Sequence, residues 1–254
     1  MRRYTAIAAD SKHLAGFRIG VMLAHPNVSV CRRPVASADP LDREPCAIPG
    51  WYGAKIVGFC KGAKGRYYPV HAADEFSDIS KLAIESLSPV VDMDWSVAAG
   101  TLDWTCWQTV DHVVDCVFSY AMQFAARAPG DFLPFHQLHA LPEATPADLV
   151  MGLRAVVDMF AAVLRSAPPD AVASDGLAEL GITDWAQRGA HEVLLHTHDV
   201  LKGLEVTFDP PGAMSEWVLR SEALWMLDLE RAKGGSDPWT ALLLASGRSV
   251  HPTG

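Results

Sequence analysis

Residues 107–128 read WQTVDHVVDCVFSYAMQFAARA, and this stretch decides the fold. Its apolar residues recur at steps of three and four positions over five turns, which is the period of an amphipathic α-helix. They are Val110, Val113, Val114, Val117, Ala121, Phe124, Ala125 and Ala128. Pro129 and Gly130 follow and end the pattern. We therefore predict a long helix that buries one apolar stripe.

Three further stretches repeat this design, and two shorter ones follow them. The long stretches are residues 74–91, 145–169 and roughly 185–204, and the shorter ones are residues 214–232 and 237–247. Thr145 is placed to cap the third long helix, because Pro146 suits the first helical turn. Four long amphipathic helices joined by loops predict an all-α fold, a four-helix bundle with additional C-terminal helices.

Residues 1–73 differ from the rest of the chain in composition. They hold 11 Lys/Arg and 4 Asp/Glu, a net charge of +7, whereas residues 74–254 hold 10 and 26, a net charge of −16. Such a break predicts a domain boundary near residue 73, between a basic N-terminal segment and a helical domain over 74–254. The stretches 17–24, 27–31 and 54–60 are typical of short strands. The segment's role stays open, as does the alternative that the functional protein begins near residue 70.

Composition and charge narrow the class of protein. The 254 residues are 50% hydrophobic and 20% charged, as in a folded domain. No run of about 18 apolar residues is present, and charged residues interrupt the basic N-terminus, so we expect a cytoplasmic protein without a membrane partner. The acidic larger part would repel nucleic acid. A small-molecule substrate is the expected partner, and monomer and homodimer both stay open.

The five cysteines predict no disulfide framework and no thiolate zinc site. Their number is odd and they form no CxxC pair. Cys106 and Cys116 could act as nucleophiles, but the more common interpretation is a buried structural cysteine.

Residues 191–200, HEVLLHTHDV, carry the clearest candidate site. Glu192 and His196 stand one helical turn apart on one face, and such a carboxylate–imidazole pair is a half-site for zinc or another divalent ion. The alternative is a solvated pair on an exposed helix face. The helical phase predicts that His191 and His198 point elsewhere.

A third metal ligand has to come from another helix. The 107–128 helix offers a polar strip beside its apolar stripe, with His112 and Asp115 three residues apart. The preceding LDWTCW favours a packed turn over an exposed one, since it holds two tryptophans. A strip that simply faces solvent is the alternative.

Three motifs in the same order resemble the DinB-like bundles, in the branch that includes mycothiol-dependent maleylpyruvate isomerase. DWTCWQTVDHVV is similar to the entry of that branch's second helix, RGAHEVLLHTHDVLKGL to its E-x-x-x-H-x-x-D helix, and DPWTALLLASGR to its C-terminal segment. The resemblance covers roughly residues 74–250. It implies a zinc between the second and fourth helices, held by Glu192 and His196. The family's remaining histidine ligand falls on Asp115, with His112 one turn back as a substitute.

The resemblance implies a metal-dependent enzyme, a thiol S-transferase or isomerase. Its cofactors would be a divalent metal, zinc, and mycothiol as the thiol cosubstrate. Arg248 would pair a cofactor or substrate carboxylate, or else cap the last helix. Because Asp115 is the aligned position, we expect Asp115→Ala to reduce metal occupancy more than His112→Ala. The alternative is a non-catalytic binding or interaction bundle whose metal site has decayed, and the aspartate at 115 favours it.

Overall fold

The structure is a computed structural model that describes residues 69–135, 138–221, 224 and 227–248. The strands predicted between residues 17 and 60 lie outside the described residues. The first helix begins at Pro69, five residues before the stretch predicted from the apolar pattern.

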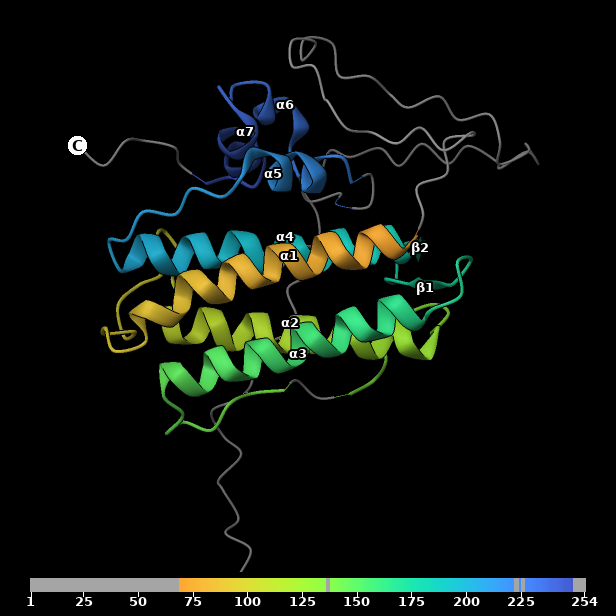
Figure 1. The fold of residues 1–254 in the computed structure, drawn as a ribbon, viewed down its shortest axis with the longest axis horizontal. Helices are drawn as coiled ribbons and strands as arrows, with labels where there is room; N and C mark the ends of the chain where they lie inside the picture. The colour runs from red at the N-terminus through yellow and green to blue at the C-terminus, as the bar shows by residue number, and fades with distance from the viewer. Residues whose placement is uncertain (1–68, 136–137, 222–223, 225–226, 249–254) are drawn as a thin grey trace, which may run out of the picture. The chain divides into compact units, whose positions relative to one another are not determined.

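Four long helices form the bundle, which confirms the predicted all-α fold with a four-helix bundle. They are α1 (Pro69–Leu87), α2 (Cys106–Ala126), α3 (Pro146–Ser166) and α4 (Ile182–Gly203), and a 3₁₀ turn, η1 (Ser88–Val90), extends α1. Figure 1 shows α1 beside α4 and α2 beside α3. α2 also packs against α4, and this contact positions the candidate site.

The core between these helices is aromatic at its centre. Phe76 of α1 meets Phe160 of α3 edge to face, with ring centroids 5.1 Å apart. A Cβ on Gly189 of α4 would lie 2.8 Å from Phe160 Cε1 and 2.9 Å from Phe76 Cε2. Only glycine fits there, because any side chain would push α4 away from these rings.

The helix ends follow the expected capping chemistry. Thr145 caps α3, as predicted, by accepting a hydrogen bond from the Asp148 amide, and the Asp148 side chain accepts from the Thr145 amide in return. Thr105 and Gln108 form the same reciprocal cap at the start of α2. α2 ends at Ala126, because Arg127 adopts the left-handed conformation with φ 51°.

Two features beyond the four long helices differ from the prediction. The predicted helix 214–232 is wrong: the chain forms α5 (Gly212–Leu219) and a separate α6 (Leu229–Ala232). The Asp228 side chain accepts hydrogen bonds from the Glu230 and Arg231 amides, so a new helix starts there. A hairpin of β1 (Val172–Ser174) and β2 (Glu179–Gly181), which the sequence analysis missed, leads directly into α4.

The last helix, α7 (Pro238–Ala245), lies within the predicted 237–247, and Asp237 caps it by accepting from the Thr240 amide at 2.9 Å. Among the described residues, no helix has the length and apolar character needed to cross a membrane.

Candidate metal centre

The candidate site lies where α2 and α4 run past each other in opposite directions (Figure 1). His112 of α2 is level with His196 of α4, with ring centroids 5.3 Å apart. Two turns further along α2, the Tyr120 hydroxyl reaches Glu192, which precedes His196 by one turn of α4. A stripe of α2 therefore faces a stripe of α4.

Three side chains converge between these stripes. One ligand atom each of His112, Glu192 and His196 lies within 4.8 Å of the other two. His196 Nε2 is 3.4 Å from Glu192 Oε2, and His112 Nε2 is 3.9 Å from the same oxygen. The side chains of Glu192 and His196 are each 13% exposed. The pair therefore does not lie on a solvent-exposed face, which was the alternative to a metal site.

Asp115 is not part of this group. Its Oδ1 accepts a hydrogen bond from the Leu138 amide at 2.8 Å, and the residue is 6% exposed. Asp111 does the same one turn earlier, because its Oδ1 accepts from the Ala140 amide at 2.7 Å. These two carboxylates fasten the loop after α2 onto the helix. The structure brings in His112, the substitute ligand, where the resemblance points to Asp115.

The second Glu192 oxygen has its own neighbours. The Tyr120 hydroxyl donates to Glu192 Oε1 at 3.2 Å, which leaves Oε2 facing the two imidazoles. His191 lies outside the three-residue group, as predicted, yet its Nδ1 is only 3.9 Å from Glu192 Oε1. Neither ring nitrogen of His191 has a hydrogen-bond partner in the part of the chain that is described. His198 points elsewhere, as predicted, with its ring edge-on to Trp239 at 5.3 Å.

An ion pair contacts the His196 ring nitrogen that does not face Glu192. The His196 Nδ1 lies 3.1 Å from Asp199 Oδ2, and Asp199 in turn accepts two hydrogen bonds from Arg248, at 2.8 Å from Nε and 2.5 Å from Nη2. Arg248 thus holds Asp199 rather than a helix end. A carboxylate on the far nitrogen of a ligating histidine fixes its ring orientation and tautomer. Sequence spacing could not pair Asp199 with Arg248, because 49 positions separate them.

The electrostatics suit a cation. Burial opposes the charge on Glu192, but the hydrogen bond from His196 and the nearby imidazoles outweigh it and hold the pKa of Glu192 well below its usual value. Burial also opposes the charge on His196, yet its bonds to Asp199 and Glu192 raise the pKa of His196. Burial lowers the pKa of His112. The site therefore combines a carboxylate with two imidazoles, and the hydrogen bonds of His196 favour a positive charge beside Glu192.

Two further residues border the site, one on α2 and one on the loop before it. The half-buried Trp104 ring lies 4.7 Å from the His112 ring and 6.4 Å from the His196 ring, measured between centroids. Cys116 Sγ lies 3.4 Å from His112 Nε2. Cys106 has the structural role expected of it, since its buried thiol faces Val200 O at 3.5 Å and burial raises its pKa to about 11.

The donor set fits a divalent ion. Two imidazoles and one carboxylate are the ligands of many catalytic zinc sites, at about 2.0–2.2 Å from the metal, so donor atoms that share a tetrahedral ion lie about 3.4 Å apart. The observed separations of 3.4 and 3.9 Å are close to that value. Each of the two imidazole nitrogens therefore already lies near ligand spacing from the Glu192 oxygen.

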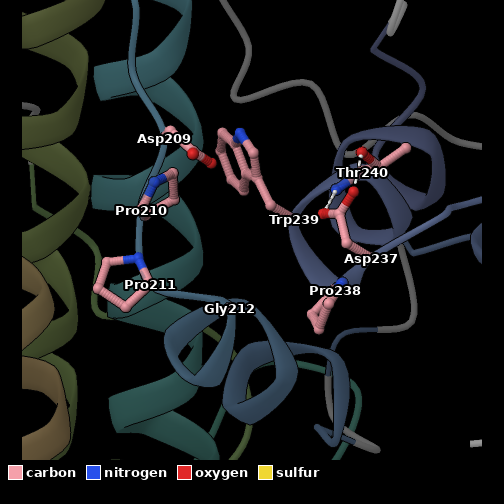
Figure 2. Close-up of a pocket in the computed structure, with 8 residues that line it drawn as sticks. All are labelled: Asp209, Pro210, Pro211, Gly212, Asp237, Pro238, Trp239 and Thr240. Carbon is pink, nitrogen blue, oxygen red and sulfur yellow. Dashed lines mark hydrogen bonds between the residues drawn. The ribbon is translucent and has the colours of Figure 1, made fainter.

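A separate cavity of about 520 Å³ lies between the segments 209–212 and 237–240, at the starts of α5 and α7 (Figure 2). Trp239 projects into it between Asp209 and Asp237. None of the predicted metal ligands lines this cavity, so it is not part of the candidate metal centre.

Comparison with known proteins gives one match. The family model for the DinB superfamily matches residues 77–200, which takes in the three converging residues. No curated protein and no solved structure matches the chain. The match identifies the superfamily and does not distinguish the branch that the motifs resemble. Members of the superfamily typically bind a divalent metal ion. The fold, the His/Glu/His group and this match together support the DinB superfamily for residues 77–200.

Proposed function

We propose that this protein is a metal-dependent enzyme of the thiol S-transferase or isomerase kind, with mycothiol or a similar small thiol as cosubstrate. His112, Glu192 and His196 hold the ion, which we propose to be zinc. The observation that carries the proposal is the convergence of these three side chains between α2 and α4. Asp115 keeps a structural role in holding the 138–140 loop.

Each residue around the ion has a definable task. Glu192 supplies the negative charge, and the Tyr120 hydroxyl orients it by occupying its other oxygen. Asp199 accepts the Nδ1 proton of His196, so that Nε2 is free to bind a metal. Arg248 keeps Asp199 ionised, because its guanidinium binds both carboxylate oxygens. When bound, zinc would lower the pKa of a coordinated thiol and present its sulfur as a thiolate.

Trp104 shapes the approach to the site. Its half-buried ring contacts both imidazoles and shields them on one side from water. A shielded site strengthens the charge interactions within it and protects a reactive thiolate from bulk solvent.

The test is metal content followed by thiol binding, on the full chain. We expect one divalent ion per chain after purification without chelators, and its loss in His196→Ala. His198→Ala is the matched control, since this histidine lies on the same helix but packs edge-on against Trp239. Calorimetric titration with mycothiol should then give binding to the metal-loaded chain and none to the chelator-treated chain. A metal-loaded chain that binds no thiol would favour a non-catalytic binding module, and a chain without metal would refute the proposed function.

A further inference from the structure

The outward side of α3 carries a second apolar row that the bundle leaves uncovered. The inner side of this helix is buried, as Leu153 and Phe160 show. On the outer side, the Met151 side chain is 63% exposed and the Met159 side chain is 49% exposed. Ala155 is exposed between them, so these three residues form one row, the outer row, at steps of four along the helix. Figure 1 shows α3 on the outside of the bundle, with no other labelled element in front of it.

The outer row has the form of one half of a helix–helix contact. Residues four apart make the ridge by which helices of globular proteins most often pack against each other. Methionine is apolar and flexible, and it is frequent at protein-binding surfaces. The alanine at the centre has a small side chain, so a second helix can approach the backbone closely there.

The order of residues in the outer row is symmetric about its centre. Met151 lies four positions before Ala155, and Met159 lies four positions after it. When two α3 helices run in opposite directions about a twofold axis at Ala155, Met151 of one chain meets the partner subunit's Met159. Both chains then offer the same surface, as a twofold contact requires. We propose that the outer row is the interface of a homodimer in which two α3 helices pack antiparallel.

Two charged side chains beside the outer row identify a second copy of this chain as the occupant. Arg154 and Asp158 are exposed one turn apart along the same edge of the row, and neither forms an ion pair or hydrogen bond within the described part of the chain. In the antiparallel pair, Arg154 lies within about 3 Å, along the helix axis, of the partner subunit's Asp158. Two equivalent ion pairs can then form. A parallel pair would place the two charged edges on opposite sides of the contact.

The dimer is expected to be weak and independent of the metal centre. A contact made by one pair of helices buries less than the roughly 1,200 Å² of stable protein complexes. The net charge of −16 on residues 74–254 adds repulsion between the two chains. The candidate metal ligands lie on α2 and α4, so changes on the outer side of α3 should leave metal binding as it is in the wild type.

Sedimentation velocity of the full chain at increasing concentration tests the dimer itself. We expect a monomer at about 1 µM and a growing dimer fraction toward about 200 µM, as for a small interface. Met151→Glu and Met159→Glu should each remove the dimer, because both place a charge in the apolar contact. Met93→Glu is the matched control, since Met93 is also exposed, at 43%, but lies outside α3. A wild-type chain that stays monomeric throughout, or a dimer that survives both α3 changes, would overturn the proposal.

Cysteine cross-linking tests the direction of the two helices. In a chain with Cys31, Cys46 and Cys60 changed to serine, Ala155→Cys should give a disulfide-linked dimer under a mild oxidant. Ala162→Cys is the matched control, because it is also exposed on α3 but would lie about 21 Å along the axis from its twin in an antiparallel pair. Cross-linking at 162 and not at 155 would overturn the antiparallel arrangement. A monomer protected from alkylation at 155 would mean that another segment of the same chain covers the outer row, and would overturn the homodimer.

Charge reversal tests the two ion pairs. Arg154→Asp and Asp158→Arg should each raise the dimer dissociation constant by about tenfold or more, since like charges then face each other across the contact. The double variant restores opposite charges and should dimerise like the wild type. A double variant as weak as the single ones would overturn the pairing of Arg154 with the partner subunit's Asp158. Circular dichroism and metal content should be unchanged in all these variants, which separates the dimer from the proposed function.

Discussion

Replacing His112 and Asp115 separately by alanine distinguishes the geometry of the site from the sequence alignment. The motif resemblance points to Asp115 as the third ligand and therefore to the larger effect from Asp115→Ala. The structure reverses this order, because His112 lies with Glu192 and His196 whereas Asp115 binds the Leu138 amide. We expect His112→Ala to weaken metal binding strongly and Asp115→Ala to weaken it little.

The magnitudes follow from what each side chain touches. Zinc bound to a structural site contributes about 10–16 kcal/mol, so one of three protein ligands is worth about 3–5 kcal/mol. His112→Ala should therefore raise the metal dissociation constant by at least about a hundredfold. Asp115→Ala removes a hydrogen bond from a buried carboxylate and should cost about 1.5–3 kcal/mol of folding stability, with less than about a tenfold change in metal affinity.

Competition with a chromophoric chelator measures the dissociation constants, and urea unfolding measures the stability of the same preparations. Circular dichroism confirms that both variants are helical before titration. The reasoning fails if Asp115→Ala binds metal a hundredfold more weakly while His112→Ala binds it normally. Equal and large losses would mean that both side chains ligate the ion, which the contact to Leu138 argues against.

Three other variants probe the surroundings of the site. Tyr120→Phe removes the hydroxyl that orients Glu192, so we expect the metal dissociation constant to rise by about 10–100-fold in the same titration; unchanged affinity would mean that the contact is incidental. Burial raises the pKa of Asp175, but the hydrogen bonds that it accepts, led by the one from Arg188, lower this pKa below the ordinary value of 3.8. The ionised Asp175 therefore stabilises the folded protein above about pH 3.8, and this stabilisation is lost as the pH falls through the pKa of the folded state. The stability difference between the wild type and Asp175→Asn in urea unfolding should therefore shrink below that pH, and a difference independent of pH would contradict this. Gly189→Ala would place a methyl group within 3 Å of two phenylalanine rings, and we expect a loss of about 1–3 kcal/mol in urea unfolding, with no loss indicating that the rings can move.

The bundle could be predicted because each long helix carries its own periodic stripe. Val110, Val113 and Val117 are all buried, and so are Leu149, Leu153 and Phe160 on α3. The hairpin before α4 gave no such signal, since strands of three residues are too short to show a period. The predicted helix 214–232 failed because apolar spacing continues across Asp228, whose side chain caps a new helix instead.

The candidate site could be predicted only in part, for a related reason. Helical phase places Glu192 and His196 on one face, because both belong to one helix. The choice between His112 and Asp115 depends on how α2 is rotated relative to α4 and on what covers its polar strip. That information lies in the loop after α2, whose amide of Leu138 binds Asp115. No local sequence pattern predicts such a contact between a loop amide and a helix side chain.

The charges buried along α4 limit what can occupy the remaining position on the ion. Arg188 and Asp199 each form an ion pair with a residue from outside the helix, so the two ends of the stripe are balanced. Between them, the hydrogen bonds of His196 to Asp199 and Glu192 raise the pKa of His196, which favours a positive charge beside Glu192. A divalent ion held by the Glu192 carboxylate and two neutral imidazoles would carry one positive charge in excess. Because an unpaired buried charge is costly, the site should prefer an anion, such as the thiolate of a small substrate, as its next ligand. The metal-loaded chain should accordingly bind a small thiolate in preference to a neutral ligand such as imidazole.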